Sequence, residues 1–156
     1  MNIFFTLLAL GCAAHTARTG LVLGDENGVY IVDTAGQSTK LRLLGEAKAV
    51  EQLLGCRLTL NGRAGLGPLL VDDWKVLDSG YGVIPFVGYL EHTGSAWRMQ
   101  DTNSGALVEF WGESLGGLAQ HAGDLVLVDG FTMGPHLVKV VSYRILIDRP
   151  PIRSGQ

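Results

Sequence analysis

The chain has 156 residues, of which 47% are hydrophobic and 17% are charged. This composition excludes a fully disordered chain and a polytopic membrane protein, and the length suits one ordinary domain or two very small ones. The 12 basic and 15 acidic side chains give a net charge of −3, which implies no strong attraction to nucleic acid or anionic lipid. The 22 glycines predict many tight turns between short strands.

The N-terminus begins with an apolar run over residues 3–10, followed by Gly11 and Cys12. This run is too short to span a bilayer, which needs about 20 residues, but it fits the core of a secretory signal. The segment Leu-Ala-Leu-Gly-Cys ending at Cys12 resembles the lipobox of bacterial lipoproteins. The resemblance implies a signal peptide over residues 1–11, a lipid anchor on Cys12 and a tether over residues 12–19. Because Ala13 rather than Asp follows the cysteine, it also implies sorting to the outer membrane, facing the periplasm. The alternatives are a plain first strand or a start assigned too far upstream, with Cys12 an ordinary thiol.

The next segment, residues 20–78, alternates between apolar and polar residues in short stretches separated by Gly, Asp and Asn. The pattern predicts five strands, with a helix between the third and fourth that ends at Gly55. The predicted strands are 21–23, 29–33, 40–44, 56–60 and 69–77, and the predicted helix is 47–54.

After a linker over residues 79–86, residues 87–148 repeat this pattern at an offset of 67 to 69 residues, and residues 149–156 form a loose tail. The second copy predicts strands 87–91, 96–101, 107–111, 125–128 and 137–147, with a helix at 115–122. The residues that pair between copies are Gly20 with Gly88, Asp33-Thr34 with Asp101-Thr102, Gly45-Glu46 with Gly112-Glu113, Gly55 with Gly123, Gly62 with Gly130, and Gly67-Pro68 with Gly134-Pro135.

Five strands with a helix between the third and fourth resemble the OB-fold, with similar small barrels as the main alternative. The expected fold class is therefore mainly β, as two tandem five-stranded OB-fold-like barrels, each with a short helix between strands 3 and 4. Two such small barrels are expected to pack on each other. The large side chains of the second copy suit that interface: Trp97, Phe110, Trp111, Phe131 and Tyr143.

OB-folds usually bind ligands across the outer faces of strands two and three. Strand alternation predicts which side chains point outward there. In the first copy they include Tyr30, Lys40 and Arg42, which could stack on and hold an anionic ligand. In the second copy the outward candidates are Arg98, Gln100, Glu109 and Trp111, with Arg98 and Trp111 as the equivalent pair. The alternative is that these residues are solvated or interdomain surface.

No catalytic or metal-binding pattern emerges from the remaining residues. The four histidines share no metal-ligand spacing, and Ser114 occupies a turn position where the first copy has alanine. Cys56 alternates with Leu58 and Leu60, which predicts a buried thiol; a Cys12–Cys56 disulfide would contradict the lipoprotein resemblance.

The sequence therefore predicts a non-enzymatic, membrane-anchored lipoprotein of the bacterial cell envelope. It would act as a binding module for a protein, a glycan or a small ligand, without a cofactor or a metal. The alternative is a single-stranded nucleic-acid binder, which would need a basic groove with stacking aromatics. A third hypothesis is an envelope enzyme whose site the sequence hides. No nucleic-acid partner is expected, because neither copy is basic.

Overall fold

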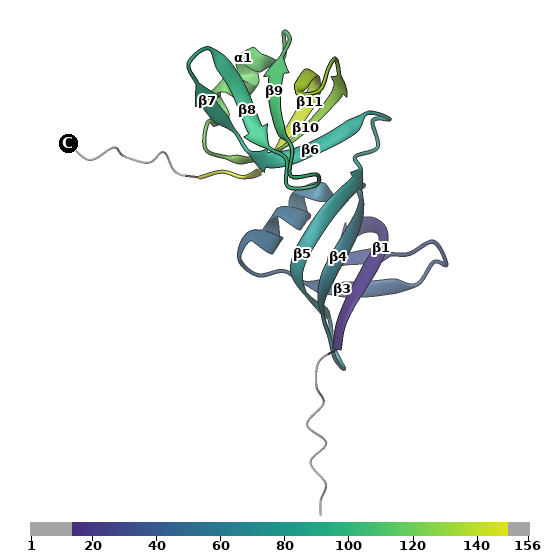
Figure 1. The fold of residues 1–156 in the computed structure, drawn as a ribbon. Helices are drawn as coiled ribbons and strands as arrows, with labels where there is room; N and C mark the ends of the chain where they lie inside the picture. The colour runs from purple at the N-terminus through teal and green to yellow at the C-terminus, as the bar shows by residue number, and fades with distance from the viewer. Residues whose placement is uncertain (1–13, 150–156) are drawn as a thin grey trace, which may run out of the picture.

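The computed structural model describes residues 14–149, which form eleven strands and three short helical segments (Figure 1). The protein is mainly β, as predicted, with two sheets of five and six strands. We call residues 14–78 the first half and residues 84–149 the second half. Cys12 and the predicted signal peptide lie outside the described residues, as do residues 150–156 of the predicted tail.

The first half is a closed barrel with the strand order β1-β2-β3-β5-β4. All neighbouring strands are antiparallel except β3 and β5, which pair in parallel. The predicted helix is a 3-10 helix, η1, which lies between β3 and β4 and ends just before Gly55 (φ 83°). The elements are β1 (Ala14–Asp25), β2 (Gly28–Val32), β3 (Ser38–Arg42), η1 (Gly45–Leu53), β4 (Arg57–Ala64) and β5 (Leu69–Asp78).

The first strand is much longer than predicted and begins inside the expected tether. Residues 14–19 were expected to be a polar linker, but they form the first half of β1. They pair with β4 from Ala14–Ala64 to Thr19–Thr59, although their side chains are mostly exposed. The prediction of a tether over these residues was wrong, because backbone pairing to β4 forms the strand without a buried face that sequence alternation could reveal.

The second half has the strand order β6-β10-β11-β9-β8-β7. Only Leu90 separates β6, which pairs with β10, from β7, which pairs with β8. When β6 and β7 are counted as one strand, the order is the same as in the first half. The elements are β6 (Ile84–Tyr89), β7 (Glu91–Thr93), β8 (Ala96–Gln100), β9 (Leu107–Trp111), α1 (Leu115–Leu118), the 3-10 helix η2 (Ala119–His121), β10 (Leu125–Thr132) and β11 (Leu137–Ile147). Strand β6 begins at Ile84, inside the linker predicted over residues 79–86.

The backbone repeats in detail between the halves. The N–H of Val22 donates to the carbonyl of Cys56. The N–H of Leu90 donates to the carbonyl of Asp124, and both of these residues lie 68 positions after their counterparts in the first half. Register shifts occur in β4 between Asn61 and Gly62 and in β10 at the equivalent step. The sequence repeat is therefore a repeat of strand pairing.

Paired glycines mark two places where the strands approach closely. A Cβ on Gly20 would lie 2.1 Å from the Val32 carbonyl oxygen, and a Cβ on Gly88 would lie 2.4 Å from that of Gln100. No side chain fits at either position without moving the neighbouring strand.

The two halves share a hydrophobic core, as expected. The core of the first half includes side chains of the second half, among them Val87, Leu127 and Leu146, and η1 packs against β11. The expected interface residues were wrong, however. Trp97, Phe110 and Tyr143 belong to a separate core of the second half, while Trp111 and Phe131 are 40% and 53% exposed.

Candidate functional site

The three candidates of the first half share the outer face of the barrel. Tyr30 on β2 lies directly opposite Lys40 on β3, and Arg42 follows on the same face of β3. Ile31 and Leu41 point inward and are buried, so the predicted alternation is confirmed. A hollow of about 250 Å³ lies elsewhere on this half, between Leu21, Val32 and Arg57, and these three candidates do not line it.

The four candidates of the second half also point outward, and Arg98 and Trp111 lie on the neighbouring strands β8 and β9, but each has a different charged neighbour. Arg98 lies between two acidic neighbours, with Glu91 opposite it on β7 and Glu109 opposite it on β9. Its Nε lies 4.0 Å from the Glu91 carboxylate. Trp111 instead pairs with Lys139 on β11, whose Nζ lies 5.7 Å from the indole centroid. Arg98 is therefore flanked by glutamates that compete with an anionic ligand.

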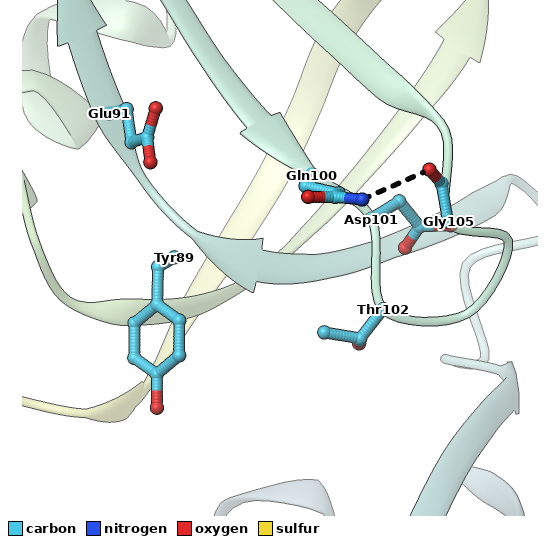
Figure 2. Close-up of a pocket in the computed structure, with 6 residues that line it drawn as sticks. All are labelled: Tyr89, Glu91, Gln100, Asp101, Thr102 and Gly105. Atoms are coloured by element: carbon cyan, nitrogen blue, oxygen red, sulfur yellow. Dashed lines mark hydrogen bonds between the residues drawn. The ribbon is translucent and has the colours of Figure 1, made fainter.

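A pocket of about 440 Å³ opens where β6, β7 and the end of β8 meet (Figure 2). Of the predicted candidates only Gln100 lines it, and its Nε2 donates to the carbonyl of Gly105 at 3.4 Å. Figure 2 shows the Tyr89 ring facing this opening from one side and Gln100 and Thr102 from the other. The full lining is Tyr89, Glu91, Gln100, Asp101, Thr102 and Gly105.

Asp101 fixes the wall of this pocket rather than serving as a free ligand group. Its side chain is 2% exposed, and its carboxylate accepts hydrogen bonds from the backbone N–H of Val87 (2.9 Å) and of Ser104 (2.9 Å). The Ser104 hydroxyl and the Asn103 N–H donate to it as well. Because the Asp101 oxygens are occupied, the groups left to contact a ligand are Tyr89, Glu91, Gln100 and Thr102.

A second hollow of about 120 Å³ lies between the halves and shares Tyr89 and Thr102 with the pocket. Its other lining residues are Glu46, Asp73, Trp74, Val87 and Leu125. We call the two hollows together the junction groove. Among the described residues that line it, four are acidic and none is lysine or arginine.

Tyr89 connects the halves at the centre of the junction groove. Its hydroxyl donates to Glu46 Oε1 at 2.5 Å, and Arg149 Nη2 donates to the same carboxylate oxygen and to the Tyr89 oxygen. The guanidinium carbon of Arg149 lies 4.0 Å from the centroid of the Tyr89 ring. Burial, followed by the hydrogen bond to Glu46, raises the pKa of the Tyr89 hydroxyl above its ordinary value, so it remains a neutral donor at physiological pH.

A separate polar cluster is buried beneath the linker. Asp129 is fully buried and accepts hydrogen bonds from the hydroxyls of Ser79 and Ser142. Arg144 Nη2 donates to the Ser79 carbonyl at 3.0 Å, which is also the nearest acceptor for the Cys56 thiol. Cys56 is a free, buried cysteine, as predicted, and burial raises the pKa of its thiol. The cluster attaches the linker to the second half.

Sequence reasoning missed most of the junction groove, including Tyr89, Glu91, Thr102 and Glu46. Within residues 14–149, no group of three or more His, Cys, Asp or Glu side chains is arranged to hold a metal ion. None of the helices formed by these residues is long and apolar enough to cross a membrane. Comparisons with protein-family models, curated proteins and solved structures give no significant match for this chain.

Proposed function

We propose that this protein is a non-enzymatic binding module, built from two tandem OB-fold-like barrels and anchored in the bacterial envelope through a lipid on Cys12. The barrel proposal is supported by the strand order β1-β2-β3-β5-β4 and by its repetition in the second half once β6 and β7 are joined. The helical segments between β3 and β4 and between β9 and β10 support it further.

We propose a neutral glycan as the ligand of the junction groove. The observation that carries this is the chemistry of the lining: an aromatic ring, Tyr89, stands beside Glu91, Gln100 and Thr102, and none of the described lining residues is cationic. Arg149, which lies over the Tyr89 ring, is paired with Glu46. Sugars offer hydroxyl donors to carboxylates and amides, and C–H faces to aromatic rings. OB-folds bind oligosaccharides and oligonucleotides, and an acidic lining repels the phosphates of the second class.

The test is a titration of the purified protein with neutral cell-wall glycan fragments and, separately, with single-stranded DNA. We expect saturable glycan binding that is weakened by Gln100→Ala and by Glu91→Gln, since each change removes a ligand contact. Lys40→Ala in the first half is the matched control and should bind like the wild type. Retention of single-stranded DNA that weakens steeply with salt and is lost in Lys40→Ala would contradict the proposal.

The alternative, nucleic-acid binding, has one observation in its favour. Tyr30 lies opposite Lys40 across β2 and β3, and Arg42 shares their face, so a stacking ring and two cations are adjacent. The titration above separates the two functions, because the variants that disable them lie on different halves.

A further inference from the structure

The first half ends in a tip at which three strand ends meet. Ala14, the first described residue of β1, pairs with Ala64 at the end of β4, and β5 begins at Leu69 after the intervening loop. We define the tip as residues 14–15 and 63–69. In Figure 1 it is the lower end of the molecule, farthest from the second half.

The tip combines an exposed apolar side chain with one arginine, Arg63. Leu66 is fully exposed at the centre of the loop, between Gly65 and Gly67. Arg63 and His15 lie opposite each other across β1 and β4, and the Arg63 guanidinium forms a two-point ion pair with Asp72 on β5, at 3.1 and 3.2 Å. One exposed leucine is ordinary on a protein surface. Leu66 is significant because it lies close to Ala14, which is two residues from Cys12, the proposed site of the lipid anchor.

The chain geometry joins this tip to the predicted anchor. Only Ala13 separates Cys12 from Ala14, so the two Cα atoms can lie no more than about 7 Å apart. Because β1 starts at Ala14, no long tether remains to hold the barrel away from lipid attached at Cys12. The loop containing Leu66 follows Ala64, the strand partner of Ala14, and is therefore brought to the same surface.

We propose that the tip is a second membrane contact, in which Leu66 inserts among the lipid headgroups while Cys12 carries the acyl anchor. This inference rests on the proposed lipid anchor. Because Arg63 is already paired with Asp72, the contact would depend on the apolar Leu66, while the anchor keeps the tip at the surface. The first half then stands with its tip on the bilayer and its opposite end away from it. Strand β5 runs from the tip toward the second half over ten residues, which holds that half up to about 30 Å from the bilayer.

The repeat supplies a matched control for the test. Met133, which is 59% exposed, occupies the equivalent loop of the second half and precedes Gly134-Pro135 as Leu66 precedes Gly67-Pro68. It lies near an apolar surface that includes Phe131 and Leu137, so it would be the membrane contact if the second half faced the bilayer instead. Asn27, in the β1–β2 turn at the other end of β1, provides a control within the first half.

The experiment uses Leu66→Cys, Met133→Cys and Asn27→Cys variants of the full chain, isolated from host membranes and reconstituted in phosphatidylethanolamine–phosphatidylglycerol vesicles. Each is labelled with a polarity-sensitive fluorophore, which the buried Cys56 should not take up. We expect the label at position 66 to shift to the blue and to be quenched by spin-labelled lipids several-fold more strongly than labels at 27 or 133.

Three results would overturn the proposal. If the intact mass shows acylated Cys12 but the label at 66 behaves like that at 27, the anchor stands and the membrane contact is wrong. If the spin-labelled lipids quench the label at 133 instead, the anchor again stands and the proposed contact at Leu66 is wrong. If the mass shows no acyl chains, both the anchor and the contact that depends on it are wrong.

Discussion

Replacing Gly20 or Gly88 by alanine tests the repeated strand crossing. Each new Cβ would lie 2.1 to 2.4 Å from a carbonyl oxygen of the neighbouring strand, whereas ordinary contacts begin near 3.4 Å. The strand must therefore move by about 1 Å, and overpacking of this kind costs roughly 1–3 kcal/mol. The lower entropy of the unfolded alanine chain offsets part of this cost, by about 0.4–1 kcal/mol.

The assay is thermal and urea unfolding followed by circular dichroism. After this offset, a net loss of about 1–2 kcal/mol corresponds to a drop in Tm of roughly 2–8 °C for a chain of this length. Gly116→Ala is the matched control, because a Cβ there meets no atom within 4 Å and the residue lies in α1. It should leave Tm unchanged or raise it slightly. Wild-type stability of both Gly20→Ala and Gly88→Ala would refute the close approach. An effect at only one of them would refute the equivalence of the halves.

Three further predictions concern single side chains. Asp101→Ala should lower the unfolding free energy by about 1–3 kcal/mol, because the buried N–H of Val87 and the partly buried N–H of Ser104 lose their acceptor. Asp33→Ala at the exposed equivalent turn should cost under about 1 kcal/mol, and equal losses in urea unfolding would contradict this. The folded state holds the Cys56 proton more tightly than the unfolded state, so its contribution to stability is complete below pH 9.0 and is lost as pH rises through the raised pKa. The urea midpoint should therefore fall less above pH 9.0 in Cys56→Ala than in the wild type, and identical pH profiles would show that the thiol is not buried in solution. Glu46→Gln should lower the pKa of Tyr89 toward 10.0, because the hydrogen bond and the charge of Glu46 both raise it. An ultraviolet titration of tyrosinate measures this, and Glu51→Gln, an exposed change on the same helix, should leave the titration as in the wild type.

Local signals were enough to predict most of the strands. The predictions 96–101 and 107–111 match β8 and β9 to within one residue, because Met99, Val108 and Phe110 alternate with exposed residues and Asp and Gly mark the turn between them. The helix before Gly55 was placed within two residues, although its hydrogen bonding is of the 3-10 type. These features depend on residues close together in the sequence.

The junction groove depends on contacts that no local pattern reveals. Tyr89 meets Glu46, 43 residues earlier, and Arg149, 60 residues later. Leu90 is fully buried between the exposed or half-buried Tyr89 and Glu91, so the alternation predicts one continuous strand. In the structure this strand changes partner from β10 to β8 at Leu90, and the pocket opens beside that change.

The halves share a backbone but differ in side chains at the positions that build this junction. Cys56 in the first half corresponds to Asp124 in the second, where both backbones make the same bonds. The buried Cys56 thiol has only a long contact of 4.0 Å to the Ser79 carbonyl, whereas Asp124 accepts a hydrogen bond from the Arg149 N–H at 2.8 Å and pairs with His121 at 2.9 Å. Asp124 therefore fixes the backbone of Arg149, whose guanidinium reaches Glu46 and Tyr89.

This difference gives the second half a side-chain acceptor next to the groove that the first half does not have at the equivalent place. A barrel with cysteine at this position lacks the acceptor that fixes the chain after its fifth strand. Arg149 also neutralises part of the charge of Glu46 at the groove's edge, so a ligand that enters between the halves meets Glu91 and Gln100 as the freer polar groups. The junction groove thus lies where two similar sheets with different side chains meet, and a single sheet with the same strand order would not contain it.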